Sequence, residues 1–451
     1  MTSRLEKRDL QHKSTGIRPT TAVARLASYC GDPENFAHQN GGGDLCKLDC
    51  NESTQAPTSE IVGAIVASLS DGGVNRYPVA TGQALLDELS GYVELDNEYI
   101  QTYPGSSAAL ETICRTFLEQ DDEALIAGPS EAHIRRYAGV CGAKSRLHLA
   151  PSPFESDACG LRQSVTPSTR LIYMANPGNP TGVVYTQREI ERILECFPQT
   201  LLVVDEALVE FHGESCAQLV RSHSNLIITR SFSGAFGLAG MRCGYILAAP
   251  EILEYTNRVR DRSHLSAPAQ AAATAALRYR GQTMEYIRQV RENRTYLALR
   301  LENMGGKAKI TPANFILLKS PQPEKMIRFL RDRNILVRDL GSVPQLEGYV
   351  RITIGDNKSC ACVVMAFEEM PEPYYRTLTD DECLAQGVLL PRRTQSLAFR
   401  RSPEVTGQSV GPDVAGRLSR SGAAQESGSY KENELSESRE FSVASAAERG
   451  Q

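Results

Sequence analysis

The sequence predicts an α/β protein with a mainly parallel sheet, and two observations support this. Residues 201–204 are a continuous apolar run of the kind expected for a strand buried on both faces, and residues 169–175 are predicted as another buried strand. Residues 186–196, between them, predict a helix that begins with the capping-box pair Thr186 and Glu189. Buried strands that alternate with helices are typical of a parallel α/β sheet.

Composition is that of an ordinary globular protein. The 451 residues suffice for two or three domains, and 41% of them are hydrophobic. The formal net charge of −5 gives no argument for nucleic-acid binding. No apolar run reaches the roughly 18 residues that indicate a transmembrane helix, and the polar N-terminus is not a secretory signal. We therefore expect neither nucleic acid nor a membrane as a partner.

The twelve cysteines are scattered along the chain and contain no CxxC pair. Such a distribution favours a reduced chain over a disulfide framework or a zinc site. We therefore predict a cytoplasmic protein without a bound metal.

The two ends of the chain differ in composition from its middle. Residues 1–46 mix charged, polar and glycine residues, and we expect a mobile N-terminal arm with a short helix over residues 20–29. From about residue 391 the chain is rich in Ser, Gly, Arg and Glu and has almost no aromatic residues. Such a segment cannot bury enough apolar surface to offset the entropy lost on ordering. We therefore predict a linker and a disordered tail over residues 371–451.

The first elements of the body include a candidate anion site. Apolar spacing predicts a helix over residues 83–95. Gly105, Ser106 and Ser107 open the next helix, which continues to residue 118. The N–H groups and the positive dipole end of a helix N-terminus attract anions. Because any helix start looks similar, an ordinary N-cap is the alternative.

Two loops follow predicted strands. Residues 123–127 lead into a loop with Glu131 and His133, and a surface histidine is the alternative to a ligand contact there. The strand over residues 169–175 leads into residues 176–182, Asn-Pro-Gly-Asn-Pro-Thr-Gly. Two X-Pro bonds and two glycines leave this second loop little conformational freedom.

Asp205 and the segment 229–245 are the next candidates. Asp205 ends a predicted strand, where open α/β sheets bind ligands; the alternative is a carboxylate that caps the next turn. Ser231 and Ser233 lie beside small residues that let the backbone approach an anion closely. Arg242 could hold a phosphate with its planar guanidinium. A Gly-rich loop between two elements is the alternative for this segment.

The C-terminal part of the body predicts further helices and strands. The helices cover residues 252–263, 267–279, 283–303 and 323–333, and the strands cover residues 309–319, 335–338 and 348–355. Arg338 and Arg351 lie in the last two strands. Arg338 is the weaker candidate of the two for a substrate contact, and a solvated charge is its simpler interpretation.

The Asn-Pro-Gly-Asn-Pro-Thr-Gly loop, the strand that ends in Asp205 and the segment 229–245, in this order, resemble motifs of the class I/II aminotransferases. These are pyridoxal-phosphate (PLP) enzymes of fold type I, and the branch that the chain most resembles is histidinol-phosphate aminotransferase. The resemblance covers roughly residues 47–370. It implies a large PLP-binding domain over residues 47–255, with the mainly parallel sheet, and a smaller α+β domain over residues 256–370. It also implies PLP as cofactor, a small amino-acid-like substrate and a homodimer.

The resemblance assigns roles to the residues that match family motifs. Asn179 corresponds to the residue that donates to the phenolic oxygen of the ring. Asp205 corresponds to the carboxylate that keeps the pyridine nitrogen protonated, which makes the ring an electron sink. Arg351 matches the arginine of an Arg-Ile-x-x-Gly motif that clamps the substrate α-carboxylate, and it is the candidate substrate contact together with Asn179. Tyr77 matches a tyrosine whose hydroxyl reaches the cofactor phosphate of the neighbouring subunit. Within one subunit, the cofactor phosphate is bound by the residues that correspond to Ser106, Ser107, Ser231, Ser233 and Arg242.

Three positions depart from the family pattern. Gly234 replaces the lysine to which the cofactor attaches, and Leu208 replaces a tyrosine that touches the phenolic oxygen. Glu131 replaces the aromatic residue that stacks on the ring, a role that His133 could take. No lysine occurs in the segment 145–306, so no neighbour in sequence can substitute for the missing amine.

Several interpretations therefore stay open. The chain is an enzyme that binds PLP or its amine form non-covalently and uses another base, such as His133 or a substrate group. Alternatively, it is a catalytically silent relative that binds a cofactor, an amino acid or a partner subunit. A conventional aminotransferase that lost its lysine by engineering or sequencing error is disfavoured, because one accident would alter one site. A scaffold or regulatory protein that acts through the tail is an alternative from a different class.

Overall fold

The computed structural model describes residues 18–27, 45–70, 74–130 and 133–376. Most of the predicted N-terminal arm, nearly all of the predicted tail and Glu131 therefore lie outside the described residues. Within the arm, the helix predicted over residues 20–29 is observed as the shorter α1, Thr21–Ala24, and the Thr20 hydroxyl caps it. Among the described helices, none is both long and apolar enough to cross a bilayer.

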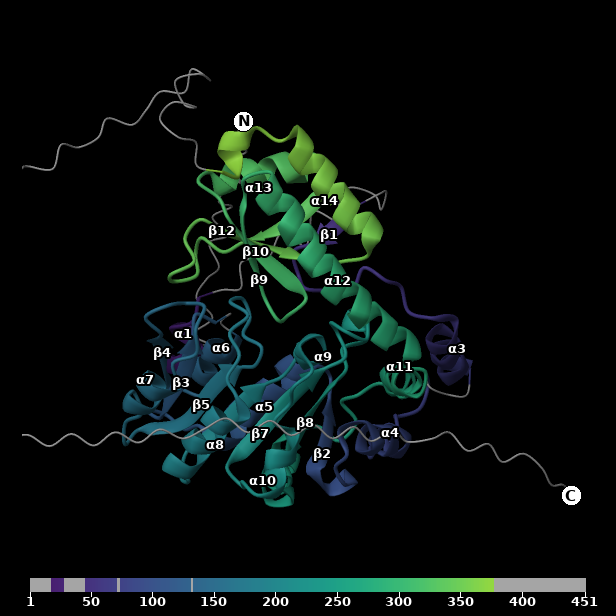
Figure 1. Cartoon of the computed structure of the whole chain (residues 1–451). Helices are drawn as coiled ribbons and strands as arrows, with labels where there is room; N and C mark the ends of the chain where they lie inside the picture. Colours follow the sequence, from purple (N-terminus) through teal and green to yellow (C-terminus); the bar gives the residue numbers. More distant parts are fainter. Residues whose placement is uncertain (1–17, 28–44, 71–73, 131–132, 377–451) are drawn as a thin grey trace, which may run out of the picture. The chain divides into compact units, whose positions relative to one another are not determined.

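Seven strands form the larger sheet, in the order β2-β8-β7-β6-β5-β3-β4 (Figure 1). From β4 through β3, β5 and β6 to β7 every pair is parallel, whereas β8 is antiparallel to both of its neighbours. This confirms the predicted α/β fold with a mainly parallel sheet. The strands are β2 (Ile100–Tyr103), β3 (Glu123–Gly128), β4 (Lys144–Leu149), β5 (Thr169–Ala175), β6 (Leu201–Asp205), β7 (Leu226–Ser231) and β8 (Gly244–Ala248).

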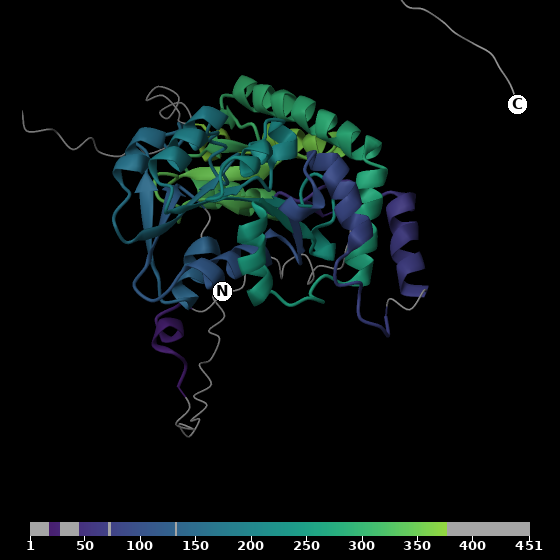
Figure 2. The same cartoon turned by 90° about the horizontal axis from the view of Figure 1, so that it is seen from below.

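Helices cover both faces of this sheet (Figure 2). Val203 and Val204 point to opposite sides of β6, as successive strand residues do, and they join different hydrophobic cores. The core around Val203 includes residues of α5 (Ser106–Phe117), α6 (His133–Val140) and α10 (Pro250–Val259). The core around Val204 includes residues of α4 (Gln83–Val93), α8 (Gln187–Cys196) and α11 (Ala267–Arg278). The remaining elements of this part are α3 (Ser59–Ser68), α7 (Ala158–Gln163), α9 (Val209–His212) and the 3-10 helices η2 (Asn97–Tyr99), η3 (Ala217–Arg221) and η4 (Ala239–Met241).

Five strands form the smaller sheet, in the order β1-β11-β12-β10-β9. They are β1 (Cys46–Leu48), β9 (Lys307–Ile310), β10 (Phe315–Lys319), β11 (Ile335–Asp339) and β12 (Tyr349–Thr353). The helices with this sheet are α12 (Gly281–Asn303), α13 (Pro323–Arg331), α14 (Asn357–Glu369) and the 3-10 helix η5 (Glu372–Tyr374). Because β1 pairs in parallel with β11, residues 46–48 join the smaller sheet although they precede every strand of the larger one.

One predicted strand is divided in the structure. The sequence predicted a single strand over residues 309–319, whereas β9 and β10 form an antiparallel pair. The Thr311 hydroxyl donates to the Phe315 carbonyl at 2.5 Å and accepts from the Ala313 amide at 3.3 Å, which closes a turn between the two strands. Hydroxyl bonds to nearby backbone compete with a continuous strand, and apolar spacing alone does not reveal them.

Candidate functional site

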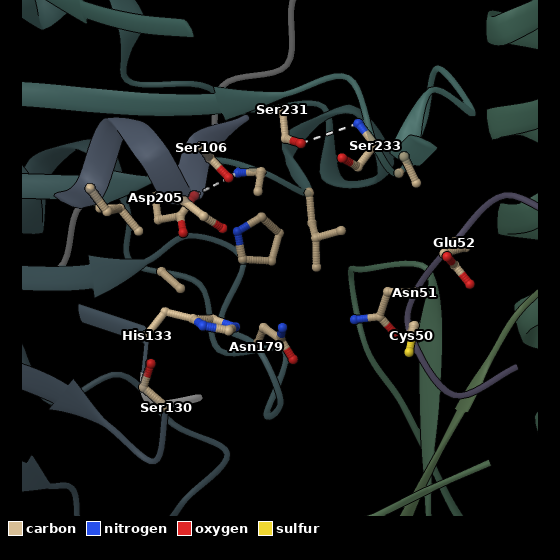
Figure 3. A pocket seen from close by; sticks show the side chains of 18 of the residues that line it. Cys50, Asn51, Glu52, Ser106, Ser130, His133, Asn179, Asp205, Ser231 and Ser233 are labelled. Carbon is tan, nitrogen blue, oxygen red and sulfur yellow. Dashed lines mark hydrogen bonds between the residues drawn. The ribbon is translucent and has the colours of Figure 1, made fainter. Parts of the chain in front are cut away.

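A cleft of about 930 Å³ lies where the carboxyl ends of β5, β6 and β7 meet the smaller sheet (Figure 3). Open α/β sheets bind ligands at this end of their strands. Segments far apart in the chain line the cleft, and they include every predicted site residue except Tyr77: Ser106, Ser107, His133, Asn179, Asp205, Ser231, Ser233, Gly234, Arg242 and Arg351. Tyr77 is 90% exposed and does not line the cleft of its own chain.

One end of the cleft is built for an anion. Gly105 precedes α5 with φ +87°, and a Cβ there would lie 2.7 Å from Nη2 of Arg242, so the guanidinium rests directly against this glycine. Arg242 Nη1 donates to the Ser233 hydroxyl at 3.4 Å, and the Ser233 amide donates to the Ser231 hydroxyl at 3.1 Å. The N-terminus of the twelve-residue α5 faces the same space. A guanidinium beside a helix N-terminus is suited to hold a phosphate.

Asp205 lies deep in the cleft. Its Oδ2 accepts from the Tyr173 hydroxyl at 2.9 Å, and its Oδ1 accepts from the Thr229 hydroxyl at 2.9 Å and the Ala207 amide at 3.1 Å. Burial raises the pKa of Asp205, against these hydrogen bonds and the nearby His133, which pull it down. All three bonded donors are neutral groups, so a cationic N–H of a ligand would stabilise the carboxylate further.

Asn179 and Arg351 join the two sides of the cleft. Arg351 Nη1 donates to Asn179 Oδ1 at 2.5 Å, and Nη2 donates to the Asp49 carbonyl at 2.7 Å. This bond turns the amide oxygen of Asn179 toward Arg351. The NH₂ group, which is the donor end of the amide, is then directed away from the arginine. Arg351 is 3% exposed, and its register partner on β11 is Arg338, which also lines the cleft.

Gly234 occupies a place that could hold a side chain. A Cβ there would lie 3.6 Å from Leu208 Cδ2, 3.7 Å from Phe211 Cε2 and 3.8 Å from the Asn51 carbonyl, all ordinary van der Waals distances. The surroundings are therefore mainly apolar, and Leu208 itself is buried. The position is compatible with a lysine stem, but glycine supplies no amine.

No described residue that lines the cleft is a lysine. Lys47 is near its wall, but its Nζ pairs with Asp49 at 3.0 Å and with Glu52 at 2.6 Å. Although burial pulls the pKa of Lys47 down, the Glu52 and Asp49 carboxylates raise it well above its ordinary value. The amine is therefore protonated and a poor nucleophile. Asp49, Cys50 and Glu52 place three potential metal ligands within 4.8 Å of one another, but both carboxylates are already paired with the Lys47 ammonium.

His133 begins α6, is exposed and lines the cleft. Figure 3 shows its ring directed into the cleft on the side of Asn179. It is close enough to Asp205 for its charge to lower the pKa of that carboxyl. The predicted exchange of roles between Glu131 and His133 stays a prediction, because Glu131 lies outside the described residues.

Comparison with known proteins settles the lineage. The family model for aminotransferase class I and II matches residues 43–367. The chain belongs to this family. A histidinol-phosphate aminotransferase of Citrifermentans bemidjiense is 32% identical over 326 residues, which is 72% of this chain and 91% of that protein. A dihydroxyacetone phosphate transaminase of Campylobacter jejuni is 29% identical over 353 residues, 77% of this chain and 95% of that protein.

Solved structures share the fold of this aminotransferase-family chain. A histidinol-phosphate aminotransferase from Sinorhizobium meliloti, in complex with pyridoxal-5′-phosphate, superposes with a TM-score of 0.72 at 23% identity and covers 78% of this chain and 97% of that one. An L-threonine-O-3-phosphate decarboxylase from Porphyromonas gingivalis has a TM-score of 0.64 at 24% identity and covers 72% of this chain and 98% of that one. Different reactions therefore occur on this fold, and the fold alone does not choose between them.

Family membership supports PLP as the cofactor that the sequence resemblance implied. The cleft fits both ends of this molecule. The anion site at Gly105 and Arg242 suits its phosphate, and the buried Asp205 suits a protonated ring nitrogen. No described lining residue is a lysine that could attach the cofactor covalently, and Gly234 is the position that the sequence resemblance matches to the family's lysine.

Sequence reasoning missed several residues that line the cleft or support its lining. Tyr173 and Thr229 donate to Asp205 from β5 and β7, which flank β6. A prediction of strand order would have found them, because strand ends that are adjacent in a parallel sheet lie side by side. Arg136, on α6, also lines the cleft, and its spacing of three from His133 was the available signal.

Proposed function

We propose that this chain binds PLP, or its amine form, without a covalent bond and acts on an amino acid or amino-phosphate. The observation that carries the proposal is the combination of Gly234 with a cleft that keeps the residues expected to contact the phosphate, the ring nitrogen and the substrate carboxylate. Asp205, Arg242 and Arg351 are all in the cleft, whereas no described lining residue supplies a free amine. The chain therefore has the means to bind cofactor and substrate but lacks the family's attachment point.

The substrate class follows from two arginines of the smaller sheet. Arg351 and Arg338 are register partners on adjacent antiparallel strands, and both line the cleft. One guanidinium suits an α-carboxylate, as the family resemblance implies for Arg351, and the other suits a second anionic group. This supports an amino acid with a second negative charge, or an amino-phosphate, over a neutral amine.

His133 is the proposed proton-transfer group. In relatives the missing lysine attaches the cofactor and moves a proton, and general acid–base catalysis of this kind contributes about 10²- to 10⁴-fold in rate. PLP, when bound, would supply the electron sink for reaction at the α-carbon. Asp205 would hold the ring nitrogen protonated, Asn179 would donate to the ring oxygen, and His133 would accept or return the proton.

A homodimer in the cytoplasm is part of the proposal. Tyr77 is 90% exposed, and α3 with its C-cap residue carries Val62, Val66 and Leu69, which are 47%, 56% and 43% exposed. Residues spaced by four and three lie on one face of a helix, so these side chains form an apolar stripe. A second copy of the chain would cover the stripe, and the Tyr77 hydroxyl could then reach the phosphate site of that copy.

A catalytically silent cofactor- or amino-acid-binding protein is the second candidate. The observation that favours it is that Leu208 and Gly234 are neighbours, with 3.6 Å between Leu208 Cδ2 and a Cβ at position 234. Two family contacts are thus changed at one spot. Ligand binding would survive both changes, whereas catalysis would be slower by about 10²- to 10⁴-fold without the proton-transfer group.

The test separates attachment from binding. Wild type, Gly234→Lys and the matched control Gly234→Ala are each titrated with PLP and pyridoxamine phosphate by calorimetry. The PLP complexes are then reduced with borohydride, and the masses of the intact proteins are measured by mass spectrometry. We expect all three to bind and only Gly234→Lys to gain the mass of reduced cofactor. A mass gain in wild type would mean that another lysine attaches the cofactor, and no binding by wild type would reject the cofactor role.

Single-turnover conversion of bound PLP to pyridoxamine phosphate by amino donors then distinguishes the two candidates. Conversion by wild type, lost in His133→Ala, supports the enzyme. Tight binding without conversion by any amino acid or amino-phosphate in a broad panel supports the silent relative.

A further inference from the structure

We propose that Arg136 is a further ligand-binding residue of the cleft and that the N-terminal segment, residues 18–27, positions it. The ligand group would be a phosphate, carried by the cofactor or by the substrate. This inference rests on the proposed function, because it concerns the same cleft.

The N-terminal segment docks on α6. A Cβ at Gly139 would lie 2.8 Å from Leu26 Cδ2, so Leu26 packs against α6 at a place where the helix has no side chain. Arg136 Nη1 donates to the Ala27 carbonyl at 3.3 Å. Positions 136 and 139 are three apart and therefore share one face of the helix. The docked segment thus packs on α6 through Leu26 and orients the Arg136 guanidinium through the Ala27 carbonyl.

The same arginine faces the cleft. Arg136 lines it together with His133, one turn earlier on α6. The next residue, Tyr137, lies close to the side chain of Ser107, and α6 packs against α5, so α6 flanks the helix start that forms the anion site. A guanidinium has five N–H donors, so a bond to a carbonyl orients its plane and is compatible with a further contact to an anion.

The charges of the cleft favour a phosphate there. Among the described lining residues, four are arginines and three are carboxylates, and of these carboxylates Asp49 and Glu52 are paired with Lys47. The third is the buried Asp205. The described lining residues therefore include more cationic than anionic groups, which favours an anionic ligand.

The test uses matched variants of the full-length chain. Arg136→Ala is compared with Arg135→Ala, which removes an exposed neighbour that does not line the cleft. Leu26→Asp, which undocks the segment without changing α6, is compared with Leu299→Asp at a 52% exposed position of α12. Dissociation constants are measured for PLP against pyridoxal, and for L-histidinol phosphate against L-histidinol. Hydrogen exchange of residues 20–27 reports docking.

We expect Arg136→Ala to weaken binding of at least one phosphate-bearing ligand about 5- to 10-fold, as for a partly exposed charge-assisted hydrogen bond, and to leave its phosphate-free counterpart unchanged. A loss confined to PLP assigns the contact to the cofactor, and one confined to L-histidinol phosphate assigns it to the substrate. Leu26→Asp should speed exchange in residues 20–27 and weaken the same ligand. Both control variants should match wild type.

Unchanged phosphate binding in Arg136→Ala would overturn the inference and leave the proposed function intact. Normal binding by Leu26→Asp despite fast exchange would overturn the positioning role. Equal losses for ligands with and without phosphate would show that Arg136 is only structural. Failure of wild type to bind PLP would reject the proposed function itself, and this inference with it.

Discussion

Arg351 Nη1 lies 2.5 Å from Asn179 Oδ1, which ties strand β12 of the smaller sheet to the loop after β5 of the larger one. Nη2 of the same guanidinium reaches the Asp49 carbonyl at 2.7 Å. The planar fork is therefore oriented by two acceptors before any ligand enters. A pre-oriented guanidinium lowers the entropy lost when it binds a carboxylate.

This relationship predicts that Arg351→Lys weakens amino-acid binding strongly, although the substitution keeps the positive charge. One ammonium cannot reproduce the two directed bonds and also clamp a carboxylate. We expect a loss of about 2 kcal/mol or more, roughly 30-fold in the dissociation constant, with cofactor affinity unchanged. Calorimetry on the cofactor-loaded protein measures it. Arg300→Lys, on the exposed surface of α12, is the control. An equal loss of cofactor affinity would indicate that the cleft collapses instead.

Asp205→Asn should stabilise the cofactor-free protein and weaken the cofactor complex. Burial raises the folded-state pKa of Asp205, so its contribution to stability is present below its unfolded pKa and lost as pH rises through the folded pKa. At neutral pH the neutral amide therefore raises the melting temperature. Loss of a charge-assisted bond to the ring nitrogen should weaken PLP binding at least about 10-fold. A lower melting temperature without cofactor would contradict this account.

Alanine should have opposite effects on stability at two glycines, Gly234 in the cleft and Gly105 beside its Arg242. At Gly234 a Cβ meets only ordinary contacts, and we expect Gly234→Ala to be neutral or stabilising by about 0.4–1 kcal/mol. At Gly105, with φ +87° and a Cβ 2.7 Å from Arg242, we expect Gly105→Ala to cost about 1–2 kcal/mol and to displace the guanidinium. Urea unfolding and phosphate-ligand titration of both variants test the contrast. Equal changes in the free energy of unfolding and in phosphate affinity for the two variants would refute the predicted contrast.

The main elements of the cleft were predictable because they sit at positions where the local pattern changes. Asp205 ends an apolar run, and Gly105 and Ser106 begin a helix, so each could be assigned a place without knowledge of the rest of the fold. The family motifs then supplied the candidate roles. The position of Gly234 came from that alignment of motifs and not from any physical property of a glycine.

Contacts between distant segments could not be predicted in the same way. Tyr173 and Thr229 are 32 and 24 residues from Asp205, and only the order and register of β5, β6 and β7 bring the three together. The division of residues 309–319 depended on one hydroxyl, that of Thr311. Lys47 reached the cleft wall because β1 pairs with the smaller sheet, which no periodicity indicated.

A buried carboxyl behind the cleft predicts how stability depends on pH. Glu210 lies on α9, and its side chain is 4% exposed. Its Oε1 accepts from the Tyr92 hydroxyl at 3.4 Å and lies 3.7 Å from Arg230, which is already paired with Glu206 at 2.8 Å. Burial raises the pKa of Glu210 to about 7, although Arg230 opposes this.

Because this folded-state pKa lies above the unfolded value, the folded chain holds a proton that the unfolded chain releases between about pH 4.5 and pH 7. The free energy of unfolding should therefore fall across this window, by an amount on the order of 3 kcal/mol from this group. Glu210→Gln should abolish that part of the fall and be more stable than wild type above pH 7. Urea unfolding at intervals from about pH 5 to pH 8 measures both curves, with Glu254→Gln, an exposed residue of α10, as control. Parallel curves for wild type and Glu210→Gln would show that Glu210 is ionised throughout the range and that its pairing with Arg230 outweighs its burial.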